Sequence, residues 1–187
     1  MLDNIKTPKD LMIYLDENFE YGVIDKNGNK CNDSSKEDFQ VACNNDWYIR
    51  PIEKMLEDKI GHCYDQVEIE RFWFEKNGYT FKTFWISAYQ ENIENSGFSH
   101  TYLVYKDKNK WKLFEHSDYF NRGIYSFKNL KDAIRFQAQN QIKTAENQIK
   151  PNSHYSVCIK EYSKPKTNLN MEKFLEFINT SKDVFLD

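Results

Sequence analysis

The fold is decided by one stretch of the sequence, Ile60-Gly-His-Cys-Tyr-Asp-Gln-Val-Glu-Ile-Glu-Arg-Phe-Trp-Phe-Glu-Lys-Asn-Gly-Tyr79. From Cys63 to Lys76 its apolar residues recur at helical intervals. They are Val67, Ile69, Phe72, Trp73 and Phe74. Asn77-Gly78 then supplies a helix stop. The stretch therefore predicts a helix of about four turns with Cys63 in its first turn.

Cys63 occupies a position in which a helix makes a thiol reactive. Gly61 lies just before it and lets the backbone turn sharply into the helix. Unpaired N–H groups and the positive end of the helix dipole then surround the sulfur, which favours the thiolate. The alternative is a small buried core cysteine, the commoner fate of a free cysteine.

The composition is typical of a soluble globular protein with an aromatic-rich interior. The 187 residues fit one domain, 1–187, and aromatic and charged residues make up 16% and 29% of them. The net charge of −3 leaves no basic field, so we expect neither nucleic acid nor an anionic membrane as a partner. The N-terminus lacks an apolar signal region and no window approaches about 18 apolar residues, which predicts a cytoplasmic protein without a membrane span. No feature of the sequence specifies an oligomeric state.

The cysteines show no metal-binding pattern. They lie at positions 31, 43, 63 and 158, without the short paired spacing of zinc sites. The histidines, at 62, 100, 116 and 154, do not share a helix face with one another at i, i+4. We therefore expect reduced thiols, no metal and no cofactor.

Helices precede the predicted nucleophile. Thr7-Pro8 has the form of a helix start, a cap followed by proline at the first helical position. The turn-rich stretch Tyr21–Ser35 is typical of a surface excursion, and we assign no chemistry to it. A short helix follows from Ser35 or Asp38, and another spans Ile52–Glu57.

After Gly78 the periodicity changes from that of a helix to that of strands. The strands are predicted at Tyr79–Tyr89 and, after a polar loop over Asn92–Gly97, at Ser99–Tyr105, Lys110–His116 and Tyr155–Lys160. Asp107-Lys-Asn-Lys between two of them indicates a hairpin. Ser126 caps a predicted helix that ends before Pro151, and another helix spans Met171–Ile178. The pattern predicts an α+β fold in which the Cys-bearing helix packs on an antiparallel sheet.

A hairpin at this position brings an imidazole and a carboxylate together. It places His100, at the start of one strand, beside Glu115 or His116 at the end of the other. A carboxylate on one ring nitrogen fixes the tautomer and stabilises the imidazolium, while the other nitrogen accepts the thiol proton. Cys63, His100 and Glu115 therefore form a predicted catalytic triad. Asp118 is the competing acid, but it lies past the strand end, where turn capping is more usual.

Three blocks of the sequence resemble the catalytic blocks of the transglutaminase-like superfamily. They are Gly61-His-Cys63-Tyr-Asp65, Ser99-His100-Thr-Tyr-Leu-Val and Trp111-Lys-Leu-Phe-Glu115. The resemblance covers roughly residues 52–127 and is that of a single-domain member of the bacterial type. It implies a papain-like core with Cys63 as nucleophile, His100 as base and Glu115 as orienting acid. The family more often has Asp at the third position, and Glu is one methylene longer.

Residues near the triad are expected to play smaller roles. His62 and His116 are more often exposed and idle at such positions. Asp65 and Glu68 are expected to balance the helix dipole. The backbone N–H of Cys63 is one natural oxyanion donor, and the sequence specifies no second one. Upstream guesses for that second donor are Asn44, Asn45 and Trp47. Strand aromatics either line an acyl-binding groove or, more often, belong to the core; they are Phe84, Trp85 and Tyr102.

These features predict a thiol enzyme of acyl chemistry. Cys63 would attack an amide of a protein or peptide, such as a peptide bond or a glutamine or asparagine side chain, and water or an amine would resolve the thioester. One alternative is an amine acyltransferase, which would need a coenzyme A site that the sequence does not show. Another is a catalytically inactive peptide-binding module on the same fold.

Overall fold

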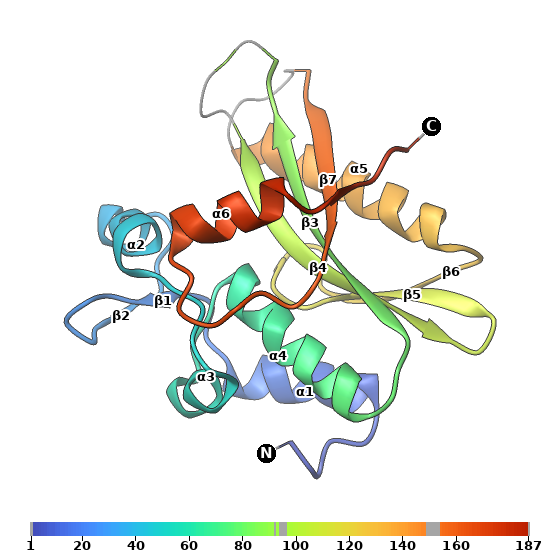
Figure 1. The fold of residues 1–187 in the computed structure, drawn as a ribbon, viewed down its shortest axis with the longest axis horizontal. Helices are drawn as coiled ribbons and strands as arrows, with labels where there is room; N and C mark the ends of the chain where they lie inside the picture. Colours follow the sequence, from blue (N-terminus) through green and yellow to red (C-terminus); the bar gives the residue numbers. More distant parts are fainter. Residues whose placement is uncertain (1, 92, 94–96, 149–153, 187) are drawn as a thin grey trace.

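The computed structural model describes residues 2–91, 93, 97–148 and 154–186. Its largest element is a six-stranded antiparallel sheet with the strand order β6-β5-β4-β3-β7-β8 (Figure 1). The strands are β3 (Phe81–Tyr89), β4 (Phe98–Asp107), β5 (Lys110–Glu115), β6 (Gly123–Phe127), β7 (Ser156–Tyr162) and β8 (Lys182–Asp183). A separate antiparallel ribbon pairs β1 (Val23–Ile24) with β2 (Lys30–Cys31).

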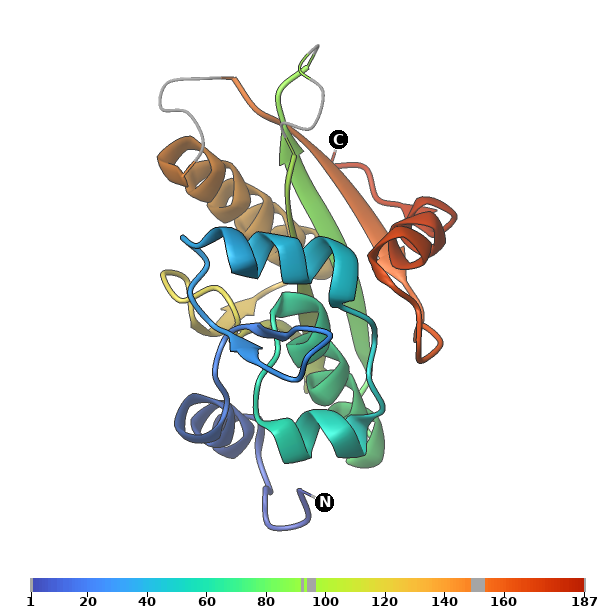
Figure 2. The same ribbon diagram turned by 90° about the vertical axis from the view of Figure 1, so that its left-hand side faces the viewer.

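Helices cover both faces of this sheet. They are α1 (Pro8–Asn18), α2 (Glu37–Val41), a π-helical turn η1 (Ala42–Asp46), α3 (Ile52–Asp58), α4 (Cys63–Lys76), α5 (Leu130–Gln148) and α6 (Met171–Asn179). Figure 1 shows α1, α2 and α3 gathered around α4. Figure 2 shows α5 and α6 on opposite sides of the long strands β3 and β7. The predicted α+β class is confirmed. Over the ranges that the structure describes, no helix is both long and apolar enough to cross a membrane.

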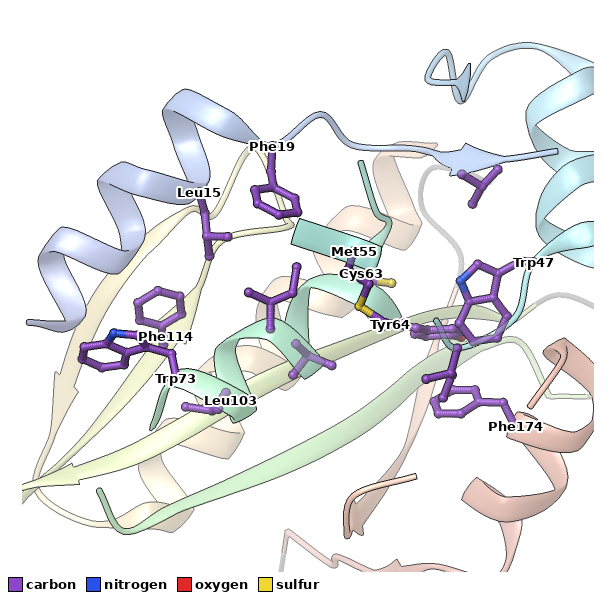
Figure 3. Close-up of a cluster of buried hydrophobic side chains, with 14 of the residues drawn as sticks. Leu15, Phe19, Trp47, Met55, Cys63, Tyr64, Trp73, Leu103, Phe114 and Phe174 are labelled. Carbon is purple, nitrogen blue, oxygen red and sulfur yellow. The ribbon is translucent and has the colours of Figure 1, made fainter. Parts of the chain in front are cut away.

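Alternation along β4 divides the interior into two layers. Successive residues of a strand point to opposite faces. Leu103 and Tyr105 join the cluster around α4, in which Figure 3 shows Leu103 near Trp73. The Tyr105 ring lies 4.7 Å from that of Phe74, centroid to centroid. Tyr102 and Val104 join a second cluster under α5. Complete burial of one such side chain stabilises the fold by about 1.5–3 kcal/mol. The α5 side of the second cluster is made by Ala133, Ile134 and Ala138.

The helix starts predicted at Pro8, Ile52 and Cys63 agree with the structure. Thr7 and Asp10 form a capping box at α1, with Asp10 N–H donating to Thr7 Oγ1 over 3.2 Å and Thr7 N–H donating to Asp10 Oδ2 over 3.0 Å. Helix α3 follows Pro51. Helix α4 begins at Cys63 and ends at Lys76, as its apolar periodicity predicts.

The prediction between the hairpin and α5 is wrong. Ser126 does not cap a helix; it lies in β6, paired with Lys112 of β5. The cap of α5 is Asn129, whose Oδ1 accepts the backbone N–H of Asp132 over 2.9 Å. Pairing with β5 overrides the local helix signal at Ser126. The end of the predicted helix and most of the predicted loop Asn92–Gly97 lie outside the described residues.

Candidate active site

Cys63 is the first residue of α4, and a close backbone contact fixes how the chain reaches it. Glu20 and Ile60 form a parallel bridge, and the Gly61 N–H donates to Glu20 O over 3.1 Å. A Cβ on Gly61 would lie 2.6 Å from Asp65 Cβ, nearer than two carbons can approach. Gly61 has no left-handed φ. It is therefore needed for close packing, and not for the sharp turn that we expected.

His100 meets Glu115 across a diagonal of the sheet. The β4–β5 pairing begins at Leu103 and Phe114, so extending the register places Glu115 one diagonal step from His100 on the same face. His100 Nε2 lies 2.8 Å from Glu115 Oε2. His100 also lies against Cys63 and lowers the pKa of its thiol, and Nδ1 is the ring nitrogen that does not face Glu115. The structure thus brings together the three residues that the sequence singles out.

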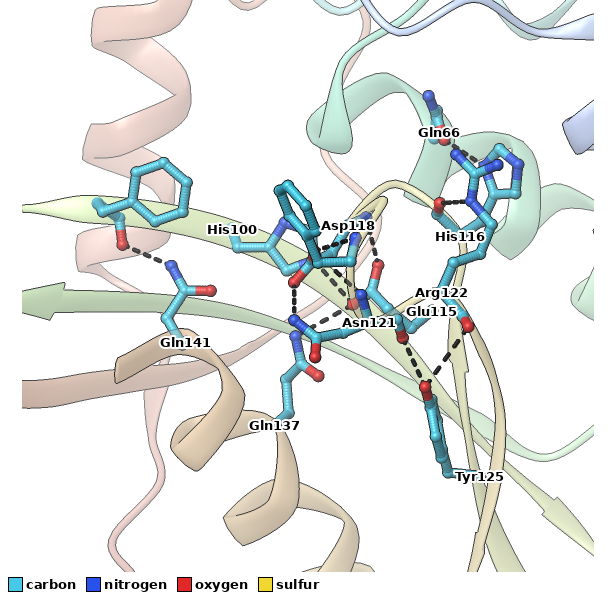
Figure 4. Close-up of polar contacts among 12 residues, drawn as sticks. Gln66, His100, Glu115, His116, Asp118, Asn121, Arg122, Tyr125, Gln137 and Gln141 are labelled. Atoms are coloured by element: carbon cyan, nitrogen blue, oxygen red, sulfur yellow. Dashed lines mark hydrogen bonds and ion pairs between the residues drawn. The ribbon is translucent and has the colours of Figure 1, made fainter. Parts of the chain in front are cut away.

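Glu115 is held from two further sides. Gln137 of α5 donates to its Oε2 over 3.1 Å, and the backbone N–H of Asp118 donates to its Oε1 over 3.0 Å (Figure 4). The Asp118 carboxylate caps its own turn instead: it accepts from Asn121 N–H over 3.3 Å and from Asn121 Nδ2 over 2.7 Å. Glu115, and not Asp118, is therefore the carboxylate bonded to His100.

Burial opposes charge on both Cys63 and His100, but their contacts outweigh it. Burial alone would raise the pKa of Cys63, yet His100, then His62 and the Thr101 N–H, bring that pKa below its ordinary value of 9.0. Burial alone would lower the pKa of His100, yet Glu115 and Cys63 raise it well above 6.5. Compared with the isolated side chains, the contacts therefore favour the thiolate form of Cys63 and the imidazolium form of His100.

The other cysteines lack such an arrangement. Burial raises the pKa of Cys43 to about 12. Burial also raises the pKa of Cys31 and of Cys158. Cys63 is the one thiol of the four whose pKa is lowered.

Tyr21 is a site residue that the sequence analysis missed. It lies next to the Glu20–Ile60 bridge and close to Cys63, and burial, followed by the Cys63 charge, raises the pKa of its hydroxyl well above the ordinary value. Its ring stacks on Phe39 of α2 with centroids 6.2 Å apart. The residue falls in the stretch to which we assigned no chemistry. Tyr21 reaches the site only because residues 20–22 pair with the segment just before Cys63. No local sequence pattern encodes that pairing.

Beneath the start of α4 lies a buried polar cluster. Asp65 Oδ2 accepts the His62 backbone N–H over 3.2 Å and the Trp47 indole N–H over 3.0 Å, and it lies 3.1 Å from His62 Nδ1. Burial lowers the pKa of His62, but Asp65 outweighs burial and the net shift is upward. His62 is 5% exposed, so the expectation that it is exposed and idle is wrong. Because the Trp47 indole already donates to Asp65, Trp47 is not an oxyanion donor.

His116 is also buried, contrary to expectation, because Gln66 of α4 provides a partner. His116 is 1% exposed, and its Nδ1 lies 2.5 Å from Gln66 Oε1. Gln66 Nε2 in turn donates to Gly61 O over 2.8 Å. Burial and then the Arg122 charge lower the pKa of His116 to about 4, so the ring is neutral. This chain of bonds ties the end of β5 to the backbone just before Cys63.

Glu70 is a buried acid behind the triad. It is 2% exposed and belongs to α4. Burial, and then the charge of Glu115, raise the pKa of Glu70 well above its ordinary value of 4.5. Burial and the nearby Glu115 charge therefore both disfavour the ionised form of Glu70.

Several other predicted residues lie away from the sulfur chemistry. Asn44 and Asn45 are exposed on η1. Glu68 pairs with Arg71, whose Nε lies 2.9 Å from Glu68 Oε2. Two of the three strand aromatics, Phe84 and Tyr102, are core residues that stack under α5, and the half-buried Trp85 packs against the α4 cluster. In the part of the chain that the structure describes, no three His, Cys, Asp or Glu side chains form a group that could hold a metal ion.

A cavity of about 440 Å³ opens beside the triad and is lined by both Tyr21 and His100. Both side chains lie close to Cys63, which does not itself line this cavity. Two further cavities, of about 360 and 370 Å³, are lined by none of Cys63, His100 and Glu115.

The sequence was compared with models of known protein families and with curated proteins, and neither comparison gave a match.

Proposed function

We propose that this protein is a thiol-dependent acyl-transfer enzyme with a transglutaminase-like, papain-like site. It would act on an amide bond of a protein or peptide through a thioester on Cys63. One observation carries the proposal: a single imidazole, His100, contacts the Cys63 sulfur and also lies 2.8 Å from Glu115. In such a triad the base takes the proton of the nucleophilic thiol and later gives it to the leaving group, while the acid holds the base in position.

In the proposed acylation the Cys63 thiolate attacks the amide carbonyl carbon and a C–S bond forms. The His100 imidazolium gives its proton to the amide nitrogen as the C–N bond breaks, and the amine leaves. Water or a second amine then gives a proton to His100 and attacks the thioester, which releases the acyl product and restores the thiolate. Glu115 remains ionised throughout and supports the imidazolium.

The negative charge that develops on the carbonyl oxygen must be stabilised by hydrogen-bond donors. The backbone N–H of Cys63 lies in the first turn of α4, where such groups have no intrahelical acceptor. Tyr21 lies close to Cys63, so we propose that its hydroxyl supplies the second donor when substrate is bound. This role replaces the upstream guesses Asn44, Asn45 and Trp47.

Hydrolysis and transamidation share this thioester and differ only in the acceptor. Both can be tested on a mixture of synthetic peptides that contain glutamine, asparagine and aromatic residues, with and without glycine methyl ester. Mass spectrometry would follow peptide cleavage, conversion of side-chain amide to acid, and incorporation of the ester. We expect the wild type to give at least one of these products and, after acid quenching, an acyl adduct on Cys63. We expect Cys63→Ala to give no product and no adduct. A rapidly alkylated Cys63 with no adduct and no product would support the inactive peptide-binding module instead.

A further inference from the structure

The cavity beside His100 has an unusual rim. Among the residues that the structure describes, eight large hydrophobic side chains are exposed, and three of them line this cavity. They are Tyr21, Tyr119 and Phe120, which are 39%, 76% and 79% exposed. Exposed apolar groups gathered at one hollow indicate a binding site, whereas single ones scattered on a surface do not.

The two most exposed rings stand on a well-fixed turn. Tyr119 and Phe120 lie edge to face with centroids 5.7 Å apart, between β5 and β6. Asp118 holds the turn by accepting the Phe120 N–H over 3.1 Å. The Arg122 guanidinium lies 5.6 Å from the Tyr119 ring centroid and donates from Nε to His116 O over 2.7 Å. The rings are therefore presented to solvent on a turn that hydrogen bonds hold in place.

Among the described residues that line the cavity, the charged side chains already have partners within the protein. Asp118 is taken up by the amides of its own turn. Arg122 is ion-paired with Asp16 of α1. The rest of the lining consists of His100, the aromatic groups and uncharged polar side chains, such as Ser99, Ser117 and Thr144. A charged ligand group would lose its hydration in this cavity without finding an oppositely charged partner, which is costly. A neutral aromatic ring flanked by amides would not incur that cost.

From these observations we propose that the cavity is the acyl-side binding site and that it selects a peptide segment carrying an uncharged aromatic side chain. The ring would pack against Tyr119 and Phe120, and the amide beyond it would lie beside Tyr21 and His100 at the sulfur. A volume of about 440 Å³ is within the range of cavities that enclose small ligands, roughly 300–1,000 Å³. This inference rests on the proposed function, since it names the substrate class of the same site.

The test uses alkylation of the wild-type protein at Cys63 by a matched set of haloacetamides. The set contains iodoacetamide itself and N-substituted forms that carry a phenylalanine amide, a lysine amide or a glutamate amide. Saturation kinetics, read by peptide mass spectrometry, separate the probe affinity from the limiting alkylation rate. We expect the phenylalanine probe to bind about tenfold more tightly than the lysine and glutamate probes, with similar limiting rates, as packing against two rings would give.

Phe120→Ser and the matched variant Phe185→Ser complete the experiment. Phe185 is 74% exposed and does not line the cavity. Phe120→Ser should lose the tenfold preference and keep its rate with iodoacetamide, and Phe185→Ser should keep both. Equal affinity for all three substituted probes, or an equal loss in both variants, would overturn the inference while fast iodoacetamide labelling of Cys63 still stands. Slow labelling of Cys63 by iodoacetamide would instead count against the proposed function.

Discussion

Glu115 Oε2 lies 2.8 Å from His100 Nε2, although the two residues are diagonal and not opposite on the paired strands. Diagonal neighbours in a sheet are farther apart than directly opposed residues, so the contact needs a long side chain. A glutamate, which is one methylene longer than an aspartate, has the length for this contact. The extra methylene spans the diagonal.

Removing the charge of Glu115 should affect activity far more than removing that of Asp118. Glu115→Gln keeps the shape but favours the wrong tautomer of His100 and no longer supports the imidazolium, so the amidase or transamidase rate should fall by about 10³–10⁴-fold. Asp118→Asn still offers an acceptor to its turn and should stay within about tenfold, which is about 1.4 kcal/mol in the barrier. Steady-state rates on one peptide substrate decide between the two acids. The reverse ranking would assign the role to Asp118.

Shortening Glu115 should also be costly, even though the charge is kept. Glu115→Asp cannot span the diagonal to His100 while it also accepts from Gln137 and the Asp118 N–H. We expect a rate loss of more than about tenfold, about 1.4 kcal/mol, with little change in KM. A variant as active as the wild type would show that the diagonal contact does not require glutamate.

Tyr21 is expected to act through its hydroxyl. Tyr21→Phe keeps the stacking on Phe39 but removes the hydroxyl close to Cys63. Loss of one oxyanion donor typically lowers kcat by about 10²–10³-fold, so kcat should fall by roughly that factor at nearly constant KM. Tyr48→Phe, at an exposed tyrosine that lines a different cavity, is the control and should change neither constant. Equal kcat in Tyr21→Phe and wild type would leave Tyr21 a packing residue.

Glu70→Gln should stabilise the protein at neutral pH. In the folded protein, burial and Glu115 raise the pKa of Glu70 above its ordinary value of 4.5. The neutral form of Glu70 therefore contributes its full stability to the fold at pH values below 4.5. That stability is lost as the pH rises from about 4.5 toward the folded pKa, and a difference of one pKa unit is worth about 1.4 kcal/mol. Urea unfolding at a series of pH values should therefore show an advantage for Glu70→Gln that grows from pH 4 to pH 8. The exposed residue Glu17 offers a control, Glu17→Gln, for which the advantage should not grow. A pH-independent difference for Glu70→Gln would contradict this account.

The sequence predicts the central part of the site because its signals are local. The apolar periodicity of Cys63–Lys76 places the cysteine at a helix start, and the hairpin pattern brings His100 near Glu115. Both depend on residues close together in the chain, or on strands joined by a short turn.

The parts that the sequence does not predict depend on contacts between distant segments. Tyr21 reaches Cys63 only through the bridge between Glu20 and Ile60. His116 is buried only because Gln66, fifty positions away, provides its partner. Ser126 has the local form of a helix cap, yet strand pairing with β5 decides its structure. Such contacts leave no periodicity in the sequence.

The most direct test of the central claim is the pH dependence of iodoacetamide alkylation at each cysteine, measured by peptide mass spectrometry in the wild type and in Glu115→Gln. The contacts with His100 lower the pKa of Cys63, and burial raises those of Cys31, Cys43 and Cys158. We predict that Cys63 labels first at neutral pH, with a midpoint below the ordinary value of 9.0 that moves upward in Glu115→Gln. If another cysteine labels first, or if the Cys63 profile has an ordinary thiol midpoint that Glu115→Gln does not move, then the three residues do not act as a triad.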